Sequence, residues 1–318
     1  MSRPKVITLT PDALDRNGTS TTETLLAARL DFLINGALST GYDRNGICAA
    51  QTPVADTALT LNGVLGVDFR DRRGVYVLIY GAGDETGATF TVIGEDALHN
   101  PLTEAITGPG AGLIVLGSTK MHHITSVTSD TAGAGDVEVG VNGYVSFATP
   151  QHVAIYSVGD DQLVTFTARG EDRYGNAMTD AITGVNAGTS TTQSKNLAWL
   201  DRITASAASA NAVEGGVTGV CESGWFLLNY RGPDFNVAIG CALNATGNLT
   251  YAMQHTFDNI LATGFVEDDA TVYTHATLTG ETTNQDGNYT NPPTATRLAI
   301  TAHTAGGVAA TVIHAGRS

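Results

Sequence analysis

The side chains of this sequence with the clearest capacity for chemistry are the carboxylates of a motif that occurs twice, Gly94-Glu95-Asp96 and Gly170-Glu171-Asp172, together with Asp84. Neighbouring carboxylates can hold a hard cation or divide acid and base roles between them. The same residues also suit a turn, because the glycine fits a strand end or bulge and an Asp side chain accepts hydrogen bonds from amides two residues further on. The acids are not joined by a calcium-loop pattern, so we favour turns.

Other catalytic patterns are missing from the sequence, which contains no GxSxG, P-loop or HExxH and no GxGxxG behind a parallel strand. His122-His123 is its only histidine doublet, and on a strand the two rings would point to opposite faces. We therefore expect a surface or edge position for the doublet rather than a shared metal. The stretch from Gly108 to Gly112 lacks a following lysine, which favours a loop over a phosphate cradle. We expect no catalytic residue, metal or cofactor, and no enzyme.

The three cysteines, Cys48, Cys221 and Cys241, form no CxxC pair and leave one over if two were bridged. Neither a disulfide framework nor a zinc site is therefore expected. We expect all three to be small, buried apolar side chains.

The carboxylate motif belongs to a duplicated unit. Residues 77–112 align without gaps onto residues 153–188, with 19 of 36 positions identical. A unit of roughly 75 residues is longer than a solenoid repeat, so it indicates two small domains rather than an array. We expect one β-module over residues 71–147 and a second over residues 148–220, in which Asn100 and Asn176 tolerate a left-handed conformation.

Alternation of apolar residues with period two begins near Gly74 and predicts short antiparallel strands separated by Gly-rich turns. We expect residues 75–80 and 89–93 to pair as a hairpin, and the aligned Phe90 and Phe166 to lie in the core. Strands do not alternate with helices. The predicted fold is mainly β, with tandem duplicated β-sandwich-like modules, a C-terminal jelly-roll-like β-sandwich and a short N-terminal helical or extended arm.

Residues 1–70 form the predicted N-terminal arm. Ser20–Glu23 has capping-box spacing, Asn35-Gly36 supplies a stop, and the apolar residues between them recur at steps of three and four. This pattern predicts one amphipathic helix, which packs either on its own domain or against a neighbouring subunit. Its candidate assembly contacts are Leu25, Leu26, Leu30, Leu33 and Ile34.

The chain has 318 residues, of which 42% are hydrophobic and only 15% charged, and its formal net charge is −15. An acidic chain without a basic patch is repelled by phosphates, so no nucleic-acid partner is expected. No apolar run reaches the roughly 18 residues that a membrane span needs. The first residues do not lead into the apolar core of a signal peptide. We expect a protein made in a cytoplasm that binds no membrane.

Residues 221–318 form the predicted C-terminal β-sandwich, in which strands at 235–243 and 249–257 are expected to pair as a hairpin. Exposed aromatic side chains on the face of a sandwich could bind a glycan. The candidates are Trp199, Trp225, Tyr230 and Tyr251, although most of the aromatic residues fall at alternating core positions.

Three stretches of this last third resemble the C-terminal part of structural proteins of tailed bacteriophages: FNVAIGCALNATGNLTYAMQHTFD (235–258), DGNYTNPPTATRLAITAH (286–303) and GGVAATVIHAG (306–316). The repeated FT..GED...N..T.AITG..AG pattern, at 90–112 and 166–188, resembles the β-modules of the same proteins. The resemblance extends over residues 55–316 and brings no catalytic motif with it.

The resemblance implies a virion component that is made in a bacterial host. Because the chain has neither a heptad run nor a short fibrous repeat, we favour a capsid decoration or cement protein over a tail fibre. The expected partners are the major capsid protein and copies of this chain, in a homotrimer held through the N-terminal region. One alternative is a head-fibre or tail knob that binds a host-surface glycan. Another is an enzyme such as a depolymerase, for which no pair of acids stands out.

Overall fold

The computed structural model describes residues 5–9, 43–69, 74–142, 145–190, 195–207, 213–230, 235–244 and 247–314. The regular elements of these residues are β-strands and a single turn of 3-10 helix, η1 (Glu267–Asp269), so the predicted mainly-β, sandwich-like fold is confirmed. The chain divides into two compact units, Asp31–Tyr144 on the one hand and Met1–Leu30 with Val145–Ser318 on the other. Each unit is described by itself.

The unit Asp31–Tyr144 contains the first repeat module, a sandwich of two antiparallel sheets with strand orders β2-β8-β3-β6 and β5-β4-β7. Its strands are β2 (Asp43–Gln51), β3 (Val75–Gly81), β4 (Thr89–Glu95), β5 (Pro101–Thr107), β6 (Ile114–Met121), β7 (His123–Ser129) and β8 (Val137–Val141).

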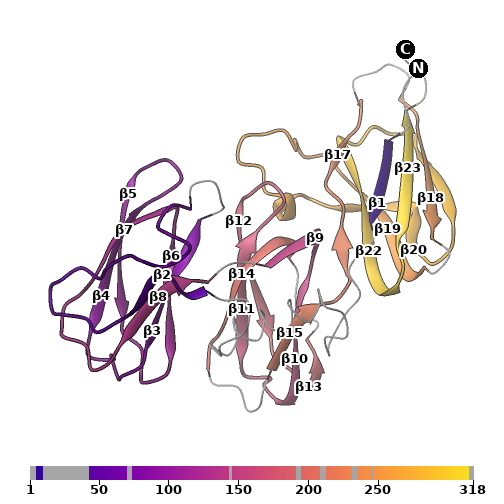
Figure 1. The fold of residues 1–318 in the computed structure, drawn as a ribbon. Coiled ribbons are helices and arrows are strands. Elements are labelled where there is room, and N and C mark those ends of the chain that lie inside the picture. The colour runs from indigo at the N-terminus through magenta and orange to yellow at the C-terminus, as the bar shows by residue number, and fades with distance from the viewer. Residues whose placement is uncertain are drawn as a thin grey trace. The chain divides into compact units, whose positions relative to one another are not determined.

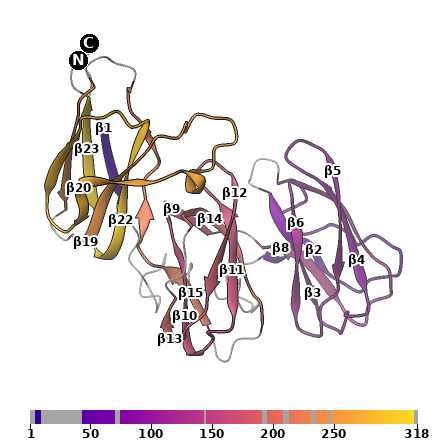
Figure 2. The ribbon, with the colours of Figure 1, turned by 180° about the vertical axis from the view of Figure 1, so that it is seen from behind.

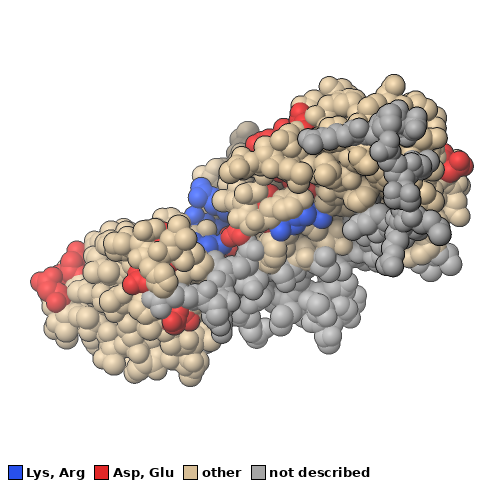
Figure 3. Space-filling view, turned by 90° about the horizontal axis from the view of Figure 1, so that it is seen from above, with Lys and Arg blue, Asp and Glu red and all other residues tan. Residues whose placement is uncertain are grey.

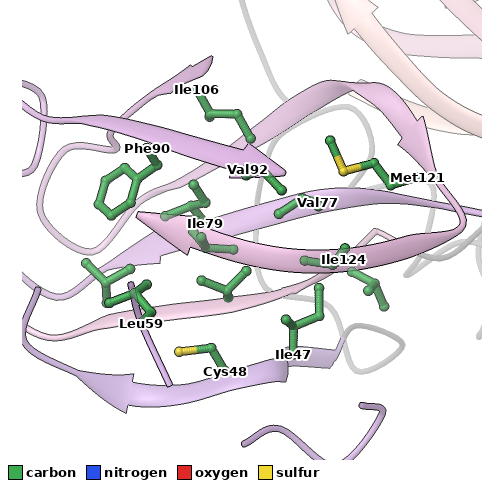
Figure 4. Close-up of a cluster of buried hydrophobic side chains, with 14 of the residues drawn as sticks. Ile47, Cys48, Leu59, Val77, Ile79, Phe90, Val92, Ile106, Met121 and Ile124 are labelled. Atoms are coloured by element: carbon green, nitrogen blue, oxygen red, sulfur yellow. The ribbon is translucent and has the colours of Figure 1, made fainter. Parts of the chain in front are cut away.

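The core of the first repeat module lies between these two sheets. Phe90 and Val92 of β4 lie in one cluster with Ile79 of β3 in Figure 4, and all three side chains are fully buried. Ile47 of β2 lies in the same cluster. The prediction that Phe90 is a core residue is confirmed, and the same holds for Phe166 in the second repeat.

The second repeat module is a sandwich with strand orders β13-β10-β15 and β12-β11-β14-β9. Six of its strands pair as their counterparts do in the first repeat: β15-β10-β13 corresponds to β8-β3-β6, and β12-β11-β14 to β5-β4-β7. Its strands are β9 (Val145–Gln151), β10 (Val153–Asp160), β11 (Thr165–Glu171), β12 (Ala177–Thr183), β13 (Asn186–Thr189), β14 (Leu197–Ala205) and β15 (Val213–Val217).

Two sequence-based expectations about the first repeat differ from the structure. The predicted hairpin between β3 and β4 is wrong, because the two strands lie in different sheets and the Gly-rich turn crosses from one sheet to the other. The predicted boundary at residue 70 falls inside the module, because β2 pairs with β8 and residues 58 and 68 form bridges to β7.

The third module is a jelly roll whose sheets have the strand orders β1-β23-β18-β21 and β16-β22-β19-β20, with β17 also paired to β22. Counted along the chain, with β16 and β17 as one interrupted strand, these orders read 1-8-3-6 and 2-7-4-5, the arrangement of an eight-stranded jelly roll. Its strands are β1 (Lys5–Leu9), β16 (Cys221–Glu222), β17 (Phe226–Leu227), β18 (Val237–Leu243), β19 (Asn248–Thr256), β20 (Tyr273–Glu281), β21 (Gln285–Tyr289), β22 (Ala295–Ala305) and β23 (Val308–His314).

The first strand of the jelly roll comes from the start of the chain. β1 pairs with β23 in antiparallel register, with Lys5 opposite Val312 and Leu9 opposite Val308, and Figure 1 shows the indigo β1 beside the yellow β23. Both repeat modules are therefore inserted between the first and second strands of the jelly roll. Residues 1–70 were predicted as a separate arm, yet β1 belongs to the C-terminal module and β2 to the first repeat.

The expected hairpin of strands 235–243 and 249–257 is also wrong. β18 and β19 are present at these positions but lie in opposite sheets, where β18 pairs with β21 and β23 and β19 with β20 and β22. The predicted N-terminal helix, with Leu25, Leu26, Leu30, Leu33 and Ile34, lies outside the described residues.

Candidate functional site

The repeated Asp96 and Asp172 each cap a turn with the same three hydrogen bonds. Asp96 Oδ1 accepts from the amides of Leu98 (2.7 Å) and Asn100 (2.9 Å), and Asp96 Oδ2 accepts from Asn100 Nδ2 (2.8 Å). Asp172 repeats these contacts with Tyr174 and Asn176 at 2.8, 2.9 and 2.8 Å. The turn interpretation of the motif is confirmed. These hydrogen bonds of both carboxylates stay within their own turns.

The carboxylate of Asp84 serves a third turn, because its Oδ1 accepts from the amide and the hydroxyl of Thr86 at 3.1 and 2.7 Å. These bonds lower the pKa of Asp84, and those from Asn100 lower the pKa of Asp96. Within the described residues, no group of three or more His, Cys, Asp or Glu side chains could hold a metal ion.

One detail of these turns differs from the prediction. The residues with positive φ are His99 (φ 64) and Gly175 (φ 85), each one position before the asparagine for which a left-handed conformation was expected. Asn100 and Asn176 instead use the side-chain amide to bind the carboxylate of the turn.

The glycines of the repeated motifs lie where the backbone approaches a neighbouring chain segment. A Cβ atom on Gly94 or Gly170 would come closer than 3.0 Å to the carbonyl oxygen of His123 or Trp199 on the adjacent strand. Both glycines stand at a shift in strand register, as expected for a bulge. The glycine that ends each AITG motif is equally confined, by the carbonyl oxygen of Glu85 at Gly108 and of Asp161 at Gly184.

A further set of buried carboxylates was missed by the sequence analysis. The Glu104 side chain is buried and accepts from the amide and hydroxyl of Ser118 and the amide of Thr119, and Asp180 at the aligned position accepts from the amide of Lys195. The alternation contained the signal, since Glu104 shares the parity of the buried Ile106 and must face inward. Glu104 thus binds amides of β6 in the facing sheet, and Asp180 binds an amide of the segment between β13 and β14.

The remaining candidates occupy structural positions. Cys48, Cys221 and Cys241 are buried free thiols, as predicted. His123 begins β7 and His122 precedes it, and both side chains are partly buried. Burial and the nearby Lys120 lower the pKa of His122.

The four aromatic residues named as glycan candidates are not gathered on an exposed face. Tyr251 is fully buried in the core of the jelly roll, and Trp225 is 7% exposed, with its ring centroid 4.6 Å from the guanidinium of Arg297. Trp199 is partly buried on β14 of the second repeat, and Tyr230 is 36% exposed.

A different set of rings forms an exposed cluster on the jelly roll, which we call the aromatic patch: His255, Phe257 and Tyr273. The side chains of Phe257 and Tyr273 are 57% and 47% exposed, and their ring centroids are 5.5 Å apart. The imidazole of His255 stacks on Tyr273 at 5.7 Å and 23°. Burial lowers the pKa of His255, which favours an uncharged ring.

A second unusual cluster lies where the second repeat meets the jelly roll, and we call it the charged junction: Arg173, Glu222, Glu267, Asp268 and Arg297. Arg173, in the turn between β11 and β12, donates from Nε to Glu267 Oε2 (2.9 Å) and from Nη2 to the carbonyl oxygen of Glu222 (2.8 Å). Arg297 of β22 has Nη2 3.8 Å from Glu222 Oε1 and its guanidinium 4.6 Å from the centroid of the Trp225 ring.

Burial dominates the electrostatics of the charged junction. It raises the pKa of Glu267 to about 7, although Arg173 and Arg297 oppose the shift, and it raises the pKa of Asp268 to about 6. Glu267 Oε1 and Asp268 Oδ2 are buried with no hydrogen-bond partner among the described residues. Both carboxyl groups therefore hold a proton more tightly here than in water.

Comparison with known proteins adds no relative to this description: no family model, curated protein or solved structure matches the chain. In the described part of the chain, no helix has the length and apolar character of a membrane span. On the face seen in Figure 3, most of the described surface carries neither acidic nor basic side chains.

Proposed function

We propose that this protein is a non-enzymatic structural component of a tailed-phage virion, a decoration protein that binds the outside of the capsid as a homotrimer. The observation that carries the proposal is that the two copies of the repeat share structural contacts. Asp96 and Asp172 make the same three hydrogen bonds at equivalent positions of their turns, and Gly94 and Gly170 each lie against a backbone carbonyl of the adjacent strand. A duplication that keeps scaffold contacts fits an assembly protein, in agreement with the resemblance to virion proteins.

The contacts to the capsid are assigned in this proposal to the segment between β1 and β2. Its sequence carries the apolar stripe of Leu25, Leu26, Leu30, Leu33 and Ile34. An acidic chain with a net charge of −15 needs apolar contacts to hold several copies together on a shell. Deleting the whole N-terminus would be a poor test, because it would also remove β1 from the jelly roll.

The sharper experiment replaces these five apolar residues by serine and leaves Lys5–Leu9 intact. We expect affinity for undecorated capsids to fall at least about a hundredfold, because several buried leucine side chains each contribute roughly 1.5–3 kcal/mol. A matched control replaces three exposed apolar residues of the repeats by serine, Val64, Leu98 and Leu163. Equal capsid binding by both variants would exclude the stripe as the anchor.

Two further observations separate this role from others. Virions that lack the protein should lose density from the capsid surface in negative-stain images, whereas loss of a tail appendage would place it elsewhere. The purified protein should scatter light as a trimer at micromolar concentration, and a monomer would contradict the proposed homotrimer.

A second candidate function, binding of a host-surface glycan, is favoured by the aromatic patch. The C–H groups of a sugar ring pack on exposed aromatic faces, and Phe257 and Tyr273 offer such faces beside an imidazole. The imidazole of His255 also contacts the buried ring of Tyr289, with centroids 5.1 Å apart, and Tyr289 in turn contacts His275 at 4.7 Å.

Glycan binding predicts a specific mutational pattern. Titration of a panel of neutral hexose oligosaccharides should show weak binding that the double variant Phe257→Ala, Tyr273→Ala loses at least tenfold, roughly 1.4 kcal/mol. Leu163→Ala, at a side chain 98% exposed in the second repeat, should bind as the unaltered protein does. No binding by the unaltered protein, or undiminished binding by the double variant, would exclude this function for the patch.

A further inference from the structure

The loop between β19 and β20 leaves the jelly roll and lies on the second repeat. We call residues 257–272 the strap. Figures 1 and 2, which view the molecule from opposite sides, both show the strap reaching the end of β12. Its turn η1 places Glu267 against Arg173, and the carbonyl oxygen of Phe265 accepts from Asn176 Nδ2 at 3.4 Å. The strap thus closes on the very turn that Asp172 caps.

The seat of the strap is polar and buried. The side chain of Glu267 is only 3% exposed, and that of Asn196 on the second repeat is equally buried, with neither its Oδ1 nor its Nδ2 bonded to another described residue. The amide of Asn196 donates to the carboxylate of Asp268. Full ionisation of both strap acids would therefore place two adjacent negative charges in a site that satisfies only part of their oxygens.

We propose that the strap is a proton-operated latch, which stays seated on the second repeat while Glu267 carries a proton and loosens when that proton leaves. The inference is independent of the virion role proposed above. The strap begins at Phe257 and ends next to Tyr273, so the two exposed rings of the aromatic patch lie at its two ends.

The two acids of the strap, Glu267 and Asp268, are surrounded by charged and titratable groups of the second repeat and of the jelly roll. Glu267 is faced by cations, by a phenol and by its acidic neighbour, namely Arg173, Arg297, Tyr174 and Asp268. Asp268 is faced in addition by Lys195 and Glu222. Because burial outweighs the cations at both acids, the seated strap binds protons more tightly than the released strap.

The direction of the pH dependence follows from this difference. The pKa of Glu267 is about 7 in the seated strap against 4.5 for a free side chain. A group with a raised pKa stabilises the seated state as pH falls through 7, and this gain is complete below the free value. Between pH 8.5 and pH 6, Glu267 alone should strengthen seating about tenfold, and Asp268 should add about twofold.

His152 is a further titratable group beside the charged junction, 3.9 Å from Glu222. Burial lowers the pKa of His152, and the charged groups that face it are Glu222, Asp180 and Arg297. None of these three belongs to the strap, so they stay in place when the strap leaves. The charges that act on His152 are therefore the same in the seated and the released strap.

Hydrogen exchange in the full-length protein tests the latch. Protection factors of peptides covering the strap and residues 172–176, corrected for the pH dependence of intrinsic exchange, should rise at least about tenfold from pH 8.5 to pH 6. In Glu267→Gln, a neutral side chain of the same shape, protection should be high at both pH values and change only about twofold. Asp286→Asn, at an exposed carboxylate on β21, serves as the control and should keep the full change.

Each outcome decides the question. A flat profile in the unaltered protein, or an equal rise in Glu267→Gln, would overturn the proposal. If circular dichroism shows that Glu267→Gln is misfolded, Asp268→Asn replaces it, and it should retain the tenfold component while losing the twofold one. If protection of the strap in Asp268→Asn did not change with pH, the pH dependence could not come from Glu267, and the latch would be refuted.

Discussion

Replacing Phe90 or Phe166 by alanine will lower the free energy of unfolding of its own repeat by about 3–5 kcal/mol. Each phenyl ring is fully buried between the two sheets of its sandwich. Alanine would remove most of the buried apolar surface and leave a cavity that the strands on either side cannot close. The loss is comparable to the whole stability of many small domains.

The two variants also report on separate modules. Phe90→Ala should weaken the unit Asp31–Tyr144 and Phe166→Ala the other unit, so hydrogen exchange of β4 and β11 amides in the full-length protein can score each loss by itself. Leu163→Ala, at a side chain that is 98% exposed, should change stability by no more than about 0.5 kcal/mol. A loss below about 1 kcal/mol in either phenylalanine variant would show that its ring does not carry the core.

Replacing Gly94 or Gly170 by alanine is expected to cost about 3 kcal/mol, at the upper end of overpacking effects. The added methyl group would lie closer than 3.0 Å to the carbonyl oxygen of His123 or Trp199. A flexible side chain could move aside, but these carbonyls belong to paired strands at a bulge, so relief requires breaking the ladder between β4 and β7 or between β11 and β14.

The matched control for this prediction is Gly240→Ala in β18, where nothing lies within 4 Å of the added Cβ. It should be neutral or slightly stabilising, because alanine lowers the entropy of the unfolded chain. Urea unfolding of the full-length variants, read by hydrogen exchange in the module that carries each substitution, compares the two cases. Equal behaviour of Gly240→Ala and Gly170→Ala would show that close backbone approach does not explain the repeated glycine.

The strands and turns of this protein follow from local rules and were therefore predictable. Period-two alternation located β4 and β11 and placed Phe90 and Phe166 inside, because neighbouring side chains on a strand point to opposite faces. The Gly-Glu-Asp motif identified its turns, because an Asp side chain reaches amides only two to four residues away. The alternation rule also predicts that Glu104 faces inward, because it lies two residues before the buried Ile106 on the same strand.

The charged junction and the aromatic patch were not predictable in this way. Arg173 and Glu267 are separated by 94 residues, and neither has a local signal for its partner. Phe257 and Tyr273 meet only because the strap leaves β19 and returns as β20. Of the aromatic residues suggested as glycan candidates, Tyr251 lies in the core of the jelly roll, and Trp225 is buried against Arg297 of the charged junction.

The sequence by itself determined which segments are strands, which residues face inward and that one unit occurs twice. Only the tertiary structure decided which strands pair. Both predicted hairpins, β3 with β4 and β18 with β19, proved to be crossings between sheets, and β1 found its partner β23 at the other end of the chain. The reason is physical: alternation specifies a face to be buried but not the edge that a strand joins, and that edge is set by how two whole sheets close over a shared core.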